Sequence, residues 1–214
     1  RSPAALYEAA IAAAGWGMLA RAMLSARQPI DAVQACLYLV LAIALKLEGF
    51  HVAPLVTHSL AGVAVLAGVV ALGPAAGASV AALSGLAFLA SRLHSADHAS
   101  PLARLRLALF GGGLNALIAL AGAGAYAALG GRWAPDTLPV SALPPLLILC
   151  LVWFIGDHLG WCLLVLLGEG RAALGTFLSR IGVHSLVVEL LPLPLLAGML
   201  AGQVGFWLGV ALIK

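Results

Sequence analysis

The sequence predicts an all-α fold, a polytopic integral membrane bundle of about six to eight transmembrane helices. Of its 214 residues, 63% are hydrophobic and 9% are charged, whereas about 25% of a soluble domain is charged. Residues 107–131 and 190–213 carry no charge, and His58 is the one titratable side chain between His51 and Arg92. Because a helix needs about 20 apolar residues to cross a bilayer, the chain can cross several times.

The apolar segments are helical in character because they lack the alternation of apolar and polar residues that membrane β-strands show. The pair Gly73-Pro74 separates two of them, since proline cannot continue a helix. We expect one membrane-embedded domain, residues 1–214, with spans near 4–19, 32–45, 52–72, 75–90, 107–129, 143–167, 183–201 and 204–213.

The basic residues predict the orientation of these spans. With eight spans, one side of the membrane receives eight of the 11 Lys and Arg residues and the other receives three. Cytoplasmic loops are enriched in Lys and Arg, so both termini are expected in the cytoplasm. Arg21 and Arg27 oppose this assignment, which makes the first hairpin of helices its weakest part.

Asp157 and His158 are the most distinctive polar residues because they lie near the middle of the sixth span. A charged carboxylate at mid-bilayer costs about 2.5–3.5 kcal/mol on insertion scales. One interpretation is a ligand, proton or ion site. The alternatives are a hydrogen-bonded Asp that fastens helices together and a shortened helix that leaves the pair near the interface.

Four further polar residues lie within apolar segments: Glu8, His58, Asn115 and Glu189. The hypothesis is that they converge with Asp157 and His158 on one intramembrane polar cavity. For each residue alone, the alternative is an interfacial position or a hydrogen bond between helices.

Metal binding and catalysis are not predicted. His94 and His98 have the spacing of two ligands on one helical face, but zinc needs three or four, and a loop facing solvent or headgroups is the favoured interpretation. The chain has no GxSxG, HExxH or Walker motif, so we expect that it is not an enzyme. A net charge of +3 does not indicate a nucleic-acid partner, and the sequence identifies neither cofactor nor ligand.

Small residues at helical spacing predict close helix contacts. They form three ridges: Ala9-Ala13-Gly17, Gly77-Ala81-Gly85 and Asn115-Ala119-Ala123-Ala127.

Residues 40–214 resemble a module of bacterial signalling proteins, the multi-span N-terminal membrane domain that precedes HD-GYP phosphodiesterase or GGDEF cyclase domains. The resemblance is carried by residues 56–60 (VTHSL), 70–76 (VALGPAA), 125–131 (AYAALGG) and 167–171 (LGEGR). It implies a sensor domain in the inner membrane of a bacterium, with a cytoplasmic C-terminus. Asp157-His158 departs from the polar Asn-Thr pair expected there.

The leading functional hypothesis is a non-catalytic membrane sensor or accessory module. Its partners would be the lipid bilayer and a protein or effector domain on the cytoplasmic side. The alternatives are the substrate-binding subunit of a vitamin-type transporter, docking through ridges such as Ala9-Ala13-Gly17, and a structural subunit of a larger membrane complex.

Overall fold

The computed structural model describes residues 2–26, 30–47, 50–53, 56–58, 61–93, 100–134 and 140–179. Within these ranges the prediction of an all-α fold is confirmed, apart from one short hairpin. The elements are α1 (Pro3–Ser25), α2 (Ala32–Leu47), β1 (Phe50–Ala53), β2 (Val56–His58), α3 (Ala61–Leu72), α4 (Pro74–Leu93), α5 (Pro101–Ala128), the 3-10 turn η1 (Val140–Ala142) and α6 (Leu143–Glu169). Residues 171–179 are also helical. The spans expected at 183–201 and 204–213 lie outside the described residues.

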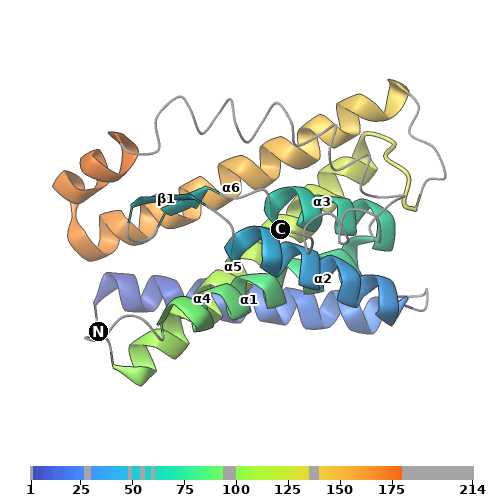
Figure 1. The fold of residues 1–214 in the computed structure, drawn as a ribbon. Coiled ribbons are helices and arrows are strands. Elements are labelled where there is room, and N and C mark those ends of the chain that lie inside the picture. Colours follow the sequence, from blue (N-terminus) through green and yellow to red (C-terminus); the bar gives the residue numbers. More distant parts are fainter. Residues whose placement is uncertain are drawn as a thin grey trace.

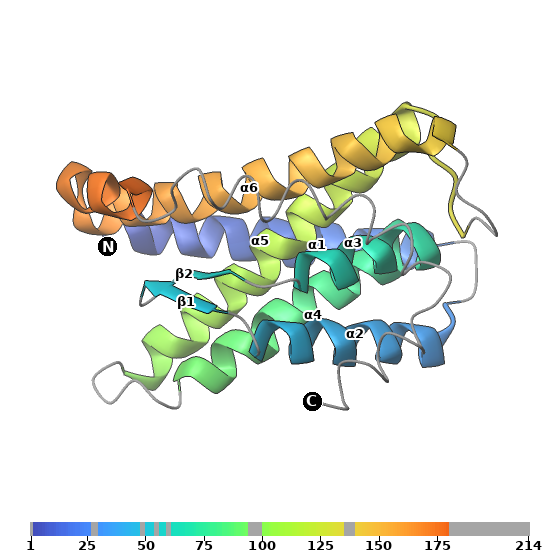
Figure 2. The ribbon, with the colours of Figure 1, turned by 45° about the horizontal axis from the view of Figure 1, so that its top comes forward.

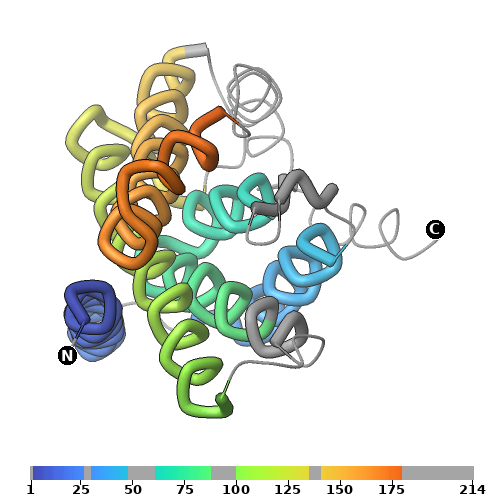
Figure 3. The backbone as a smooth tube through the Cα atoms, turned by 90° about the vertical axis from the view of Figure 1, so that its left-hand side faces the viewer, coloured from blue at the N-terminus to red at the C-terminus, as the bar shows by residue number. Residues whose placement is uncertain are grey.

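The long helices run side by side, so the bundle has two ends (Figure 1). The N-terminus of α1, the start of α5 and the C-terminus of α6 meet at one end, which we call the charged end because it holds Glu8, Arg106 and Glu169. At the opposite end Tyr126 packs against Trp133, with ring centroids 4.9 Å apart. Seen along the helices in Figure 3, α4 and α5 lie between α1 and α2.

Local sequence explains where α1 and α5 begin. Ser2 and Ser100 are N-caps, each followed by proline, and their hydroxyls accept hydrogen bonds from the amides of Ala5 and Ala103 at 3.3 and 3.2 Å. Serine at this position satisfies an amide that has no partner within the helix, and proline fits the first turn. Both helices therefore start at a residue that the sequence specifies.

The helix predicted from residue 52 is wrong in its first part, where β1 and β2 form an antiparallel hairpin (Figure 2). His58 pairs with Phe50 on this hairpin, so it does not lie in a helix. The cause is Pro54, which disfavours a helix at and before its position, together with β-branched neighbours that favour strands. The helix begins at Ala61.

Glycine contacts hold α1 against α5. A Cβ added to Gly15 would lie 2.0 Å from the carbonyl oxygen of Gly113, so only glycine allows the two backbones to approach this closely. Two of the small-residue ridges are confirmed in large part as buried: Gly77, Ala81 and Gly85 on α4, and Asn115, Ala119 and Ala123 on α5. The Ala9-Ala13-Gly17 ridge is exposed. The prediction that this ridge contacts another helix of the bundle is therefore wrong.

Two of the described helices, α5 and α6, are long and apolar enough to cross a membrane. The helices α2 and α3 are shorter, with 16 and 12 residues. Length and composition therefore support two membrane spans among the described residues, fewer than the six to eight expected.

Candidate functional site

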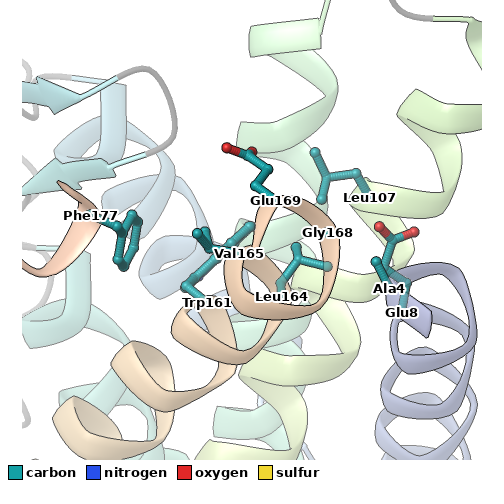
Figure 4. Close-up of a pocket in the computed structure, with 9 residues that line it drawn as sticks. All are labelled: Ala4, Glu8, Leu107, Trp161, Leu164, Val165, Gly168, Glu169 and Phe177. Atoms are coloured by element: carbon teal, nitrogen blue, oxygen red, sulfur yellow. The ribbon is translucent and has the colours of Figure 1, made fainter. Parts of the chain in front are cut away.

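A cavity of about 210 Å³ lies at the charged end, between α1, α5, α6 and the helical residues 171–179. Figure 4 shows the side chains around it. Its walls combine apolar, aromatic and acidic residues and are formed by Ala4, Glu8, Leu107, Trp161, Leu164, Val165, Gly168, Glu169 and Phe177.

Glu8 is the buried carboxylate of this cavity, with 7% of its surface exposed. Its Oε2 atom forms an ion pair with Nε of Arg106, whose side chain is 47% exposed. Removing one partner of a buried pair leaves an uncompensated charge, so the pair couples α1 to α5 at the cavity wall. Glu8 faces α5 because it lies two helical turns before Gly15, the residue in backbone contact with that helix.

Trp161 connects the cavity to the middle of α6. Its indole lines the cavity and packs edge-on against Phe110 of α5, with centroids 5.4 Å apart and an interplanar angle of 82°. Asp157 lies one turn earlier on the same helix. Next to Trp161, the Tyr7 hydroxyl donates a hydrogen bond to the carbonyl oxygen of Gly160 at 3.2 Å.

Asp157 is partly buried, and Lys46 at the end of α2 attracts its carboxylate electrostatically. Charges within a membrane are usually stabilised by a partner.

His158 is held by its own helix. Nδ1 lies 2.8 Å from the carbonyl oxygen of Phe154, and the imidazole stacks on the Phe154 ring with centroids 4.1 Å apart. A carbonyl oxygen only accepts hydrogen bonds, so Nδ1 carries the proton. In the neutral ring Nε2 is therefore the atom left to accept a proton or a hydrogen bond.

Asn115 lies between α4 and α5 and is buried. Its Nδ2 donates to the carbonyl oxygen of Ala81 at 3.3 Å, and the Ser84 hydroxyl donates to the same oxygen at 3.0 Å. Gly85 provides the space, since a Cβ there would lie 2.5 Å from Nδ2. These contacts give Asn115 the role of joining two helices.

The cavity thus contains Glu8, whereas Asn115, Asp157 and His158 are not among its lining residues. His58 is in β2, and its side chain, like all of Glu189, lies outside what the structure describes. Sequence reasoning missed Arg106, Trp161 and Glu169. One signal existed for Arg106, because it is the last charge before the uncharged run 107–131.

Within the described ranges, no group of three His, Cys, Asp or Glu side chains is placed to hold a metal ion. Comparisons with known proteins give no match to a family model, to a curated protein or to a solved structure.

Proposed function

We propose that this chain is a membrane-embedded helical bundle of six to eight spans with its charged end in the cytoplasm. At 1.5 Å per residue, the 27 residues of α6 extend about 40 Å, longer than the 30 Å hydrocarbon core. Arg104 and Arg106 open α5 and Arg171 follows α6, so basic residues gather at this end, as they do on the cytoplasmic side of membranes. The resemblance to a domain of bacterial signalling proteins is the reason for proposing the inner membrane of a bacterium as the location.

Cysteine labelling tests this topology. Leu159 on α6 and Leu102 at the start of α5 are 57% and 74% exposed. In a background that lacks Cys36, Cys150 and Cys162, Leu102→Cys should react with a membrane-impermeant maleimide applied from the cytoplasmic side. Leu159→Cys should stay unlabelled until detergent is added. Equal labelling of both positions in intact membranes would contradict the membrane location.

The function proposed for the bundle is that of a non-catalytic sensor or accessory module, which passes an event in the membrane to a cytoplasmic partner. The observation that carries this proposal is the Glu8–Arg106 pair in the cavity wall. A ligand that competes for Glu8 changes the coupling of α1 to α5, and half-exposed Arg106 can move into water. A ligand shifts a conformational equilibrium only through such differential contacts.

Spin-label distances test this function. Labels at Leu6 of α1 and Leu105 of α5, both exposed near the charged end, report the separation of the two helices in nanodiscs. Arg106→Gln removes the pair and should broaden or shift the distance distribution. Arg171→Gln, an exposed cation outside the pair, is the matched control. A distribution unchanged by Arg106→Gln would refute the proposed coupling.

A second function, as the small-molecule-binding subunit of a transporter or a structural subunit, is favoured by the exposed Ala9-Ala13-Gly17 ridge. Nothing lies within 4 Å of a Cβ built on Gly17, so Gly17→Leu leaves the bundle intact but blocks close docking of another helix. This reading predicts a stoichiometric partner that is lost on Gly17→Leu and retained on Gly175→Leu, a change at another open glycine. A small molecule extracted with the protein would favour the transporter subunit.

A further inference from the structure

We infer that the cavity at the charged end binds the primary ammonium group of an amphiphile, such as the headgroup of phosphatidylethanolamine. The inference rests on the proposed membrane location and names the chemistry to which the proposed sensor responds. Three features of the cavity carry it: its charge, its aromatic walls and its position at the membrane boundary.

The charged side chains that line the cavity are both acidic, Glu8 and Glu169. Glu8 is buried and shared with Arg106, whereas Glu169 is exposed at the C-terminus of α6 (Figure 4). An ammonium group donates three hydrogen bonds, and bonds between charged partners are about twice as strong as neutral ones. A ligand with one ammonium group can therefore be held by Glu169 while competing with Arg106 for Glu8.

Two aromatic residues, Trp161 and Phe177, complete the walls. Aromatic faces attract cations, and tryptophan does so best. The packing of Trp161 against Phe110 fixes one of these walls. Ala4 and Gly168 contribute little side-chain volume, which leaves the space between the acids and the aromatics open.

The cavity lies where headgroups are expected. Leu107, which lines it, is the first residue of the uncharged run in α5, and Gly168 and Glu169 end α6. Arg106 is within reach of the headgroup phosphate once the ammonium group occupies Glu8. A volume of about 210 Å³ accommodates the headgroup and leaves the chains outside.

Native mass spectrometry of the full chain, released from phosphatidylcholine nanodiscs that contain a minor fraction of deuterated phosphatidylethanolamine, tests the inference. We expect one retained phosphatidylethanolamine per protein, saturating with its mole fraction. Glu169→Gln should weaken retention about tenfold, the loss expected for one charge-assisted hydrogen bond. Phe177→Leu should weaken it less. Asp31→Asn is the control, because it removes a carboxylate elsewhere and keeps an N-cap that binds the amides of Val33 and Gln34.

Two further arms identify the source of the ammonium group. Free ethanolamine that competes at millimolar concentration and loses its effect in Glu169→Gln would assign the cavity to soluble amines as well as lipid. Equal retention of phosphatidylcholine, non-saturating retention, or retention unchanged by Glu169→Gln would overturn the inference.

The lipid-retention experiment and the spin-label experiment can fail independently of each other. Phosphatidylethanolamine binding without any change in the spin-label distances would refute the sensor and keep the ligand. Distances that respond to Arg106→Gln without specific lipid retention would refute the ligand and keep the sensor.

Discussion

Helices α5 and α6 have nearly the same length, 28 and 27 residues, and both are apolar enough to cross a membrane, but they occupy opposite environments. In their most apolar stretches 67% of the α5 residues are buried and 33% of the α6 residues. Helix α5 contacts α1, α4 and α6, whereas α6 turns a long row of large side chains outward.

The difference is in residue size. Helix α5 carries Gly111-Gly112-Gly113 and Asn115 where other helices approach it. The exposed residues of α6 are branched and large: Leu143, Leu147, Leu151, Ile155, Leu159, Leu163 and Leu167. Apolar helices of soluble proteins bury such residues, so a mostly exposed apolar helix marks a surface that lipid or a protein partner covers. Both helices are apolar, and the size of their residues decides whether other helices of the bundle can pack closely against them.

The largest difference between the two helices is expected for substitutions of their glycines. A Cβ on Gly113 of α5 would lie 2.9 Å from the Cα atom of Ala12, whereas a Cβ on Gly168 of α6 meets Ala4 at an ordinary 3.7 Å. Gly113→Leu should therefore prevent α1 from docking and abolish the folded bundle, measured as loss of monodisperse protein in detergent. Gly168→Ala should keep full thermal stability, and a loss of fold there would contradict the packing described.

Core truncation should have the next largest effect. Phe110 of α5 is fully buried between Tyr7 and Trp161, and Phe110→Ala should lower the free energy of unfolding by about 3–5 kcal/mol. Leu159→Ala on the outer face of α6 should change it by less than about 0.5 kcal/mol. Thermal unfolding in the same detergent measures both. Similar losses for the two variants would mean that α6 is covered by protein.

A smaller effect is expected for the polar contact of α5. Asn115→Ala removes the hydrogen bond to Ala81 and should cost about 0.6 kcal/mol, the average for such bonds in membrane helices, and at most about 1.7 kcal/mol. The cost stays low because Ser84 still donates to the same carbonyl. Thr176→Ala, which removes a bond within a single exposed helix, should be neutral. Equilibrium unfolding in mixed micelles measures the free energy of unfolding of both variants.

The smallest effect concerns the helix starts. Helix α5 has a side-chain cap and α6 has none. Ser100→Ala should cost about 0.5–1 kcal/mol, visible as faster amide exchange in the first turn of α5. Ser141→Ala, in the turn before α6, should leave exchange in α6 unchanged. Equal protection of the first turn of α5 with and without Ser100 would show that packing alone sets this helix start.

Much of the fold followed from local sequence, because proline, serine caps and uncharged runs act within a few residues. The boundaries of α4 and α6 lie within three residues of those expected at 75–90 and 143–167. The hairpin was missed because its apolar residues outweighed Pro54. The pairing of Glu8 with Arg106 could not be derived, because it depends on which face of α1 meets α5. Single-sequence periodicity was ambiguous there, since alanine and glycine occupy both faces.

The hairpin Phe50–His58 imposes an asymmetry on how this molecule can move. Among the described residues its two strands pair only with each other, so their outer amides and carbonyls need shelter or water, and open strand edges do not face hydrocarbon. The flank that holds α2, the hairpin and α3 must therefore keep these strand edges away from lipid during any rearrangement. Among the described residues the opposite flank is built of helices, and there α1 can shift only slightly, because a larger movement would expose buried Glu8 and break the hydrogen bonds of Tyr7 and Trp16.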